Sequence, residues 1–169
     1  MTIKKIIENL FFSNIWIALC SVSVTLSTFL YFNITLNYYF FGLVFFATLF
    51  SYNLQNIGER KIHKKRSNQI IWIESNNKII KLIILIALIF SIFFSFVSLN
   101  CSAFLISSPF LLLVIFYRKN FLNKIKFRNI PGLKILIISI CWTWPCCLLP
   151  QILYKTNIEW TFACFIFLF

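Results

Sequence analysis

The residues best suited to chemistry gather where the second long apolar run of this 169-residue chain ends. That run closes with amides, a glycine and a carboxylate, and the candidate polar side chains are Asn53, Gln55, Asn56 and Glu59. Such side chains can line the mouth of a cavity between helices and hydrogen-bond a ligand there. The alternative interpretation is that they solvate a helix end, for which Gly58 is a suitable C-terminal cap.

A second set of candidates is basic and follows the second and fourth apolar runs. Guanidinium and ammonium groups bind phosphate or diphosphate, and they also hold a loop against anionic lipid headgroups. Both interpretations stay open for Arg60, Arg66, Arg118, Lys119, Lys126 and Arg128.

No side chain stands out as a catalytic residue, and no metal site is predicted. The single histidine, His63, lies in a basic loop, and the six cysteines form no Cys-x-x-Cys pair. A structural zinc site needs thiolate and imidazole ligands close together, so the sequence makes no cofactor evident.

Long apolar runs must position these residues. A composition of 60% hydrophobic and 12% charged residues, with a mean hydropathy of +0.88, excludes an ordinary soluble domain. A helix of about 20 apolar residues crosses a bilayer core. We therefore expect an all-α fold, a polytopic membrane helical bundle of five transmembrane helices plus a partial sixth, in a single transmembrane domain over residues 1–169. The spans are about 15–32, 38–54, 82–99, 103–117 and 133–149, with the partial span at 160–169.

The charges alternate along the chain in a way that predicts a topology. Fifteen of the 16 Lys and Arg residues precede the first run or fall in every second gap after it. Because cytoplasmic loops accumulate such residues, loops 55–81 and 118–134 and the N-terminus are expected in the cytoplasm, and the protein in the cell (inner) membrane. A net charge of +12 spread over these loops indicates the lipid bilayer and its anionic headgroups as partners, and no nucleic acid.

Three local patterns complete the expectations. Residues 1–14 have apolar positions at helical spacing and predict an amphipathic entry segment. A stripe of small and hydroxylic residues in the first span is interpreted as a packing seam, with a substrate-lined wall as the alternative. Pro145 removes a backbone hydrogen bond and is expected to kink the fifth span. The stripe consists of Ala18, Ser21, Thr25 and Thr28.

The order of these pieces resembles the UbiA superfamily of intramembrane prenyltransferases, and above all its short bacterial members. The resemblance is carried by Tyr52-Asn53 after the second span, by Arg128-Asn129-Ile130-Pro131-Gly132-Leu133-Lys134-Ile135, and by Trp142 and Leu149-Pro150. It implies a helical bundle with a cytoplasm-facing cavity, in which Asp-rich loops hold Mg²⁺ against an isoprenyl diphosphate. An isoprenoid lipid would then be a ligand.

The chain also departs from that family's pattern. It contains no aspartate, and Leu54 and Ile57 stand where the first motif has its magnesium-binding carboxylates. The run 160–169 is half the length of a span, so we expect an interrupted chain. The leading hypothesis is a protein resembling the N-terminal part of a UbiA-type enzyme and inactive as it stands. The alternatives are a non-enzymatic membrane assembly or lipid-binding subunit, and an active prenyl-transfer component completed by another polypeptide. The sequence identifies no partner protein.

Overall fold

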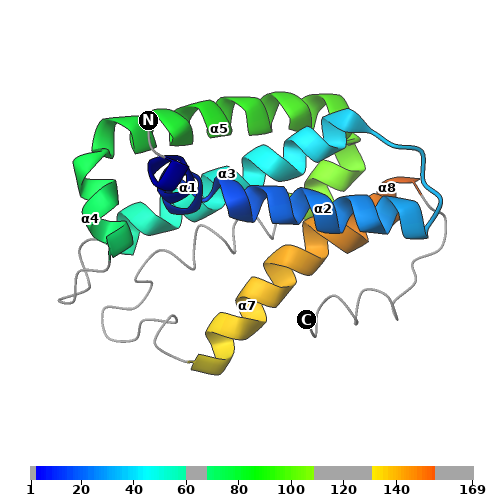
Figure 1. Cartoon of the computed structure of the whole chain (residues 1–169). Coiled ribbons are helices and arrows are strands. Elements are labelled where there is room, and N and C mark those ends of the chain that lie inside the picture. Colours follow the sequence, from blue (N-terminus) through cyan, green and yellow to red (C-terminus); the bar gives the residue numbers. More distant parts are fainter. Residues whose placement is uncertain (1–2, 60–67, 109–130, 155–169) are drawn as a thin grey trace. The chain divides into compact units, whose positions relative to one another are not determined.

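A computed structural model describes residues 3–59, 68–108 and 131–154, and the regular structure in these residues is helical. The predicted all-α class is therefore confirmed. The run 160–169, most of loop 118–134 and the second half of the run 103–117 lie outside the described residues. In chain order, the elements are α1 (Ile3–Phe12), α2 (Ile15–Tyr31), α3 (Tyr38–Glu59), α4 (Asn68–Ser75), α5 (Asn77–Ser98), a helical stretch at 101–108, α7 (Pro131–Thr143), the π-helical segment η2 (Trp144–Leu148) and α8 (Leu149–Tyr154) (Figure 1).

Helix α5 has the properties of a membrane span. Its 22 residues extend about 33 Å at 1.5 Å per residue, and a bilayer core is about 30 Å thick. Only 11% of its most apolar stretch is buried, whereas a core helix of a soluble protein would be mostly buried. Within the described part of the chain it alone meets both the length and the hydropathy of a span. Three shorter helical stretches are also apolar, at Ile15–Tyr31, Tyr38–Leu54 and Ile138–Tyr154.

The residues group into two compact units. The first unit comprises Met1–Val22 and Tyr38–Val97, and the second comprises Ser23–Asn37 and Ser98–Phe169. Helix α2 therefore contributes its first half to the first unit and its second half to the second.

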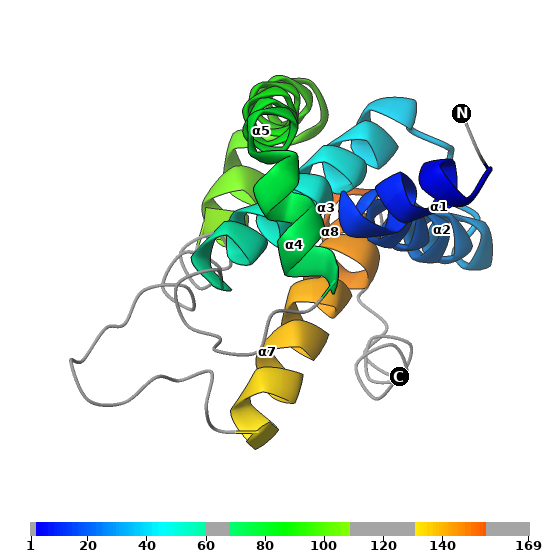
Figure 2. The same ribbon diagram turned by 60° about the vertical axis from the view of Figure 1, so that its left-hand side comes forward.

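Helices α3 and α5 of the first unit run antiparallel. Near the start of α3, the ring of Tyr39 lies 6.4 Å from that of Phe94, near the end of α5. Further along α3, Leu49 shares a buried cluster with Ala87, which lies earlier in α5. The end of α3 is consequently level with the start of α5, and α4 runs across the direction of α5 between them (Figures 1 and 2).

A glycine permits a close approach between these two helices. A Cβ atom added at Gly42 would lie 3.0 Å from Cε2 and Cζ of Phe94. The Phe94 ring has little room to move, because it also packs against Phe46 and Phe90, at ring-centre distances of 5.8 and 6.2 Å.

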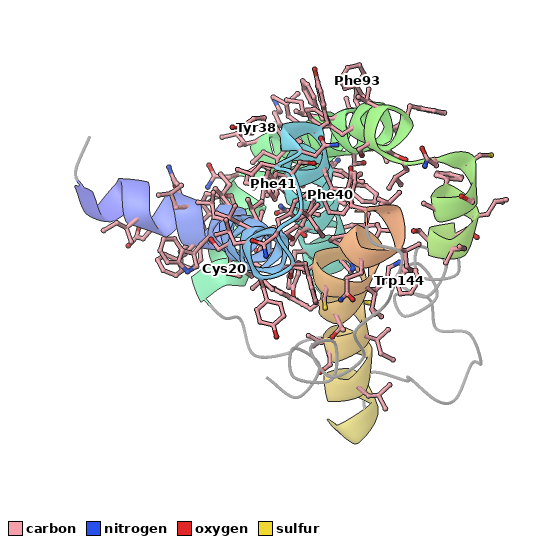
Figure 3. The ribbon with its side chains drawn as sticks, turned by 90° about the vertical axis from the view of Figure 1, so that its right-hand side faces the viewer. Cys20, Tyr38, Phe40, Phe41, Phe93 and Trp144 are labelled. Carbon is pink, nitrogen blue, oxygen red and sulfur yellow. The ribbon has the colours of Figure 1, made fainter. Side chains whose placement is uncertain are left out.

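The outer side of α5 is apolar and exposed. Phe93 projects away from α3 (Figure 3), and Phe96 is 81% exposed. Leu85, Ile89 and Ile92 are also exposed. In water this surface would carry a large hydrophobic penalty, whereas in hydrocarbon it carries none.

The stripe predicted along the first span is a packing seam. Ala18, Ser21, Thr25 and Thr28 are all buried. The Ser21 hydroxyl donates to the Ala18 carbonyl at 2.8 Å, and that of Thr28 donates to the Val24 carbonyl at 3.2 Å. Because the hydroxyls of Ser21 and Thr28 bond within their own helix, these two positions present small, satisfied side chains to their neighbours.

At Pro145, where a kink is predicted, the structure contains the π-helical segment η2. The Leu149 N–H donates to the Trp144 carbonyl, five residues earlier, and the Thr143 hydroxyl donates to the Ser139 carbonyl at 2.9 Å. Proline lacks the N–H that an α-helix needs at this position, and widening the turn lets the helix continue through α8.

The contact at Gly42 generates a prediction. Replacing Gly42→Ala should destabilise the protein by about 1 kcal/mol, because overpacking costs about 1–3 kcal/mol and the gain in helix propensity returns at most about 1 kcal/mol. Thermal unfolding in detergent measures the effect.

A double-mutant cycle supplies the control. In a Phe94→Leu background the ring is gone, so Gly42→Ala should become neutral or stabilising. An equal loss in both backgrounds would show that the close approach at Gly42 is not the cause.

Candidate functional site

The candidate polar residues lie at the end of α3. Asn53 is completely buried, and Gln55, Asn56 and Glu59 fall within the last turns of the helix. The antiparallel pairing of α3 and α5 places Lys78 and Lys81 at this same end, and both lysines are exposed. For the other three candidates the structure describes the backbone alone.

The predicted basic candidates are not placed by the structure. Arg60, Arg66, Arg118, Lys119, Lys126 and Arg128 lie outside the described residues. Their roles in phosphate or headgroup binding therefore stay predictions.

The Asn53 side chain joins α3 to the junction between α1 and α2 through its amide. Its Nδ2 donates to the Ser13 carbonyl at 2.8 Å and to the Leu49 carbonyl at 2.9 Å. Its Oδ1 accepts a hydrogen bond from Nδ2 of Asn14 at 3.1 Å. A primary amide has two N–H donors, and both are used here. We name Asn53, Ser13 and Asn14 the asparagine clamp.

The clamp secures the break between α1 and α2. Asn14 has a positive φ of 62°, a left-handed conformation that asparagine tolerates better than most residues. The Ala18 N–H donates to the Asn14 carbonyl at 3.2 Å and begins α2. The chain can therefore change direction at Asn14 without leaving the buried amides unsatisfied.

A second contact fixes α1 against α4. The indole N–H of Trp72 donates to Oδ1 of Asn9 at 3.1 Å. The same ring packs against Phe12 at a centre distance of 5.7 Å. Trp72 is half-buried, so it serves here as a bridge between two short helices.

The second unit contains a further buried polar group that sequence reasoning missed. Gln151 is completely buried, and its amide donates to the Cys147 carbonyl at 3.3 Å and to Cys147 Sγ at 3.4 Å. Cys146 is also buried and forms a side-chain hydrogen bond with Thr25. The sequence did contain a signal for it, because Gln151 follows an apolar run almost directly. A glutamine amide in such a place needs a hydrogen-bond partner.

A polar contact also joins the end of α8 to the segment after α2 in the second unit. The Asn37 amide donates to the Tyr154 hydroxyl at 2.8 Å. The Tyr154 ring packs on Phe29 at 5.6 Å, so α8 is attached to the segment that follows α2.

The described residues do not fit a magnesium ion. They contain no group of three or more His, Cys, Asp or Glu side chains that could hold a metal. Asn53 directs its oxygen at Asn14, and Leu54 beside it offers no oxygen ligand. Mg²⁺ requires oxygen ligands in octahedral geometry, and the side chains that the structure describes supply no such set.

No family model, curated protein or solved structure matches this chain.

The clamp generates a prediction about stability. Replacing Asn53→Ala leaves the Ser13 carbonyl and the Asn14 amide buried without their partner. Each unsatisfied group costs about 1–3 kcal/mol, so we expect a loss of about 2 kcal/mol or more in unfolding free energy. Thermal unfolding of the protein in nanodiscs tests this.

The matched control is Ser51→Ala, two residues away on the same helix. The Ser51 hydroxyl donates only to the Ala47 carbonyl of its own helix, at 2.8 Å, so its loss should cost less than about 0.5 kcal/mol. The clamp would lose its assigned role if the two variants unfolded at the same temperature.

Proposed function

We propose that this chain is a multi-pass protein of the cell (inner) membrane with a cytoplasmic N-terminus. In this proposal five transmembrane helices form a bundle and a sixth begins near Trp160. The length and exposed apolar surface of α5 support it, as do the three shorter apolar helices. Hydrocarbon as the solvent accounts for side chains such as Phe93 and Phe96, which lie on the outside of the first unit.

The pairing of α3 with α5 supports the proposed topology. Both helices have their charged residues at one end, where Glu59 closes α3 and Lys78 and Lys81 lie in the first turns of α5. The opposite end carries Tyr38 and Tyr39, both exposed, and tyrosines are enriched at membrane–water interfaces. An antiparallel pair with a basic end and an aromatic end is suited to crossing a bilayer once in each direction.

We further propose that the bundle has a UbiA-like architecture without the diphosphate chemistry of that family. The architecture rests on the sequence resemblance described above. The observation that carries the second part of the proposal, the loss of diphosphate chemistry, is the commitment of the Asn53 amide. Asn53 is the residue that matches the family's first motif, and both of its N–H groups donate to backbone carbonyls of this chain. It is placed to hold α1 and α2 to α3, and no donor is left for a phosphate oxygen.

A transfer assay tests this function. Membranes containing the full chain, incubated with a labelled isoprenyl diphosphate and magnesium, should give no transfer above membranes without it. The proposal would be contradicted if the membranes transferred the isoprenyl group and if Asn53→Ala abolished this transfer while the protein stayed folded. It would favour the alternative of an active component completed by another polypeptide.

Cysteine labelling tests the topology. Cys101 is exposed and follows α5, so an impermeant maleimide should label it from outside in intact cells. In a Cys101→Ser background, Ser67→Cys and Asn123→Cys should react only after permeabilisation, because both lie in basic loops. External labelling of either introduced cysteine would overturn the shared cytoplasmic side.

A further inference from the structure

Helix α1 turns its apolar side outward. Along its apolar arc, Ile7, Leu10 and Phe11 are all exposed. Its other side carries Asn9 and Phe12, which contact Trp72 of α4. An amphipathic helix on a soluble protein packs its apolar side inward. Helix α1 has the reverse orientation, and its exposed apolar side chains therefore need an apolar surface outside the protein.

The direction of α1 suits the plane of a membrane surface. In Figure 1, α1 is seen nearly end-on while α2 lies across the view, so the two helices meet at a steep angle at Asn14. The side chain of Trp16, in the first turn of α2, is half-exposed and stacks on Phe11 at 5.6 Å. Tryptophan is enriched at the membrane–water boundary.

The charge is predominantly basic at the end of the first unit that carries α1, the end of α3, α4 and the start of α5. The lysines of α1 and α5 stand against three acids, Glu8, Glu59 and Glu74. The segment that joins α3 to α4 adds five more basic residues in the sequence. The basic residues are Lys4, Lys5, Lys78 and Lys81 in the helices, and Arg60, Lys61, Lys64, Lys65 and Arg66 in the joining segment.

We propose that α1 is an in-plane interfacial helix that binds the cytoplasmic leaflet. Its apolar arc enters the boundary between headgroups and acyl chains, and Lys4 and Lys5 attract anionic phosphate headgroups. This inference rests on the proposed membrane topology. Among the side chains that the structure describes here, the four half-exposed ones of the arc and Trp16 offer less area than the about 800 Å² that each partner of a stable protein complex buries. A lipid surface needs no such minimum.

Photo-crosslinking from the full chain tests the contact with lipid. The protein is placed in nanodiscs made of equal amounts of phosphatidylcholine and phosphatidylglycerol, with Phe11→p-benzoylphenylalanine as the probe. Irradiation should give lipid adducts at this position. The matched control is Phe12→p-benzoylphenylalanine, which should crosslink to the peptide containing Trp72. Ile7→p-benzoylphenylalanine repeats the test if the first variant does not fold.

The lipid composition of the adducts tests the charge. Phosphatidylglycerol should exceed phosphatidylcholine at least about twofold, given the attraction that basic residues feel near an anionic surface. Combining Lys4→Gln with Lys5→Gln should return the ratio towards one. An initial ratio of one would overturn the headgroup preference.

Two further outcomes separate this inference from the proposed function. Phe96→p-benzoylphenylalanine, on the exposed side of α5, should form lipid adducts if α5 spans the membrane. Adducts at 96 together with protein crosslinks only at 7 and 11, to a second copy or within the chain, would refute the interfacial helix alone. Absence of lipid adducts at all three positions would refute the membrane topology itself.

Discussion

The fold of the first unit depends on one amide. A polar group that is buried away from water costs free energy unless it is hydrogen-bonded, so a buried polar side chain must find partners within the protein. Asn53 does so with the Ser13 carbonyl, the Leu49 carbonyl and the Asn14 amide. These bonds fix where α2 begins relative to α3, and they stabilise the left-handed backbone at Asn14. The position of α1, and hence of its contact with α4, follows from that junction.

The same requirement explains the other polar groups of the interior. Hydroxyls such as Ser21 and Thr28 bond to carbonyls of their own helix, and the Gln151 amide bonds to Cys147 four residues earlier. Such local bonds satisfy each group without fixing which helix lies next to it. Asn53 differs from these three groups because two of its partners are about 40 residues away in the chain, and this gives it a specific role in assembly. Thr25 likewise has a distant partner, since it forms a side-chain hydrogen bond with Cys146.

Much of the secondary structure could be predicted from the sequence, because apolar run length and helical spacing are local properties. The span 15–32 corresponds to α2 within one residue, and the interpretation of the stripe from Ala18 to Thr28 as a packing seam is confirmed by its burial. The partners of Asn53 could not be predicted, since nothing in the sequence pairs it with Asn14 rather than with a ligand. Helical spacing indicates the amphipathic segment at the N-terminus, but not that its apolar side faces outward, because that depends on the packing of Asn9 and Phe12 against Trp72.

The π-helical segment at Pro145 has a consequence for interpreting the C-terminal part of the second unit. A wide turn of this kind amounts to one extra residue inserted into an α-helix, and one residue corresponds to about 100° of rotation. A helical wheel drawn continuously from Pro131 would therefore assign Gln151 and Tyr154 to the wrong azimuth. With the offset included, the π-helical segment accounts for the positions of both side chains. Gln151 then reaches Cys147, and the Tyr154 hydroxyl reaches the Asn37 amide.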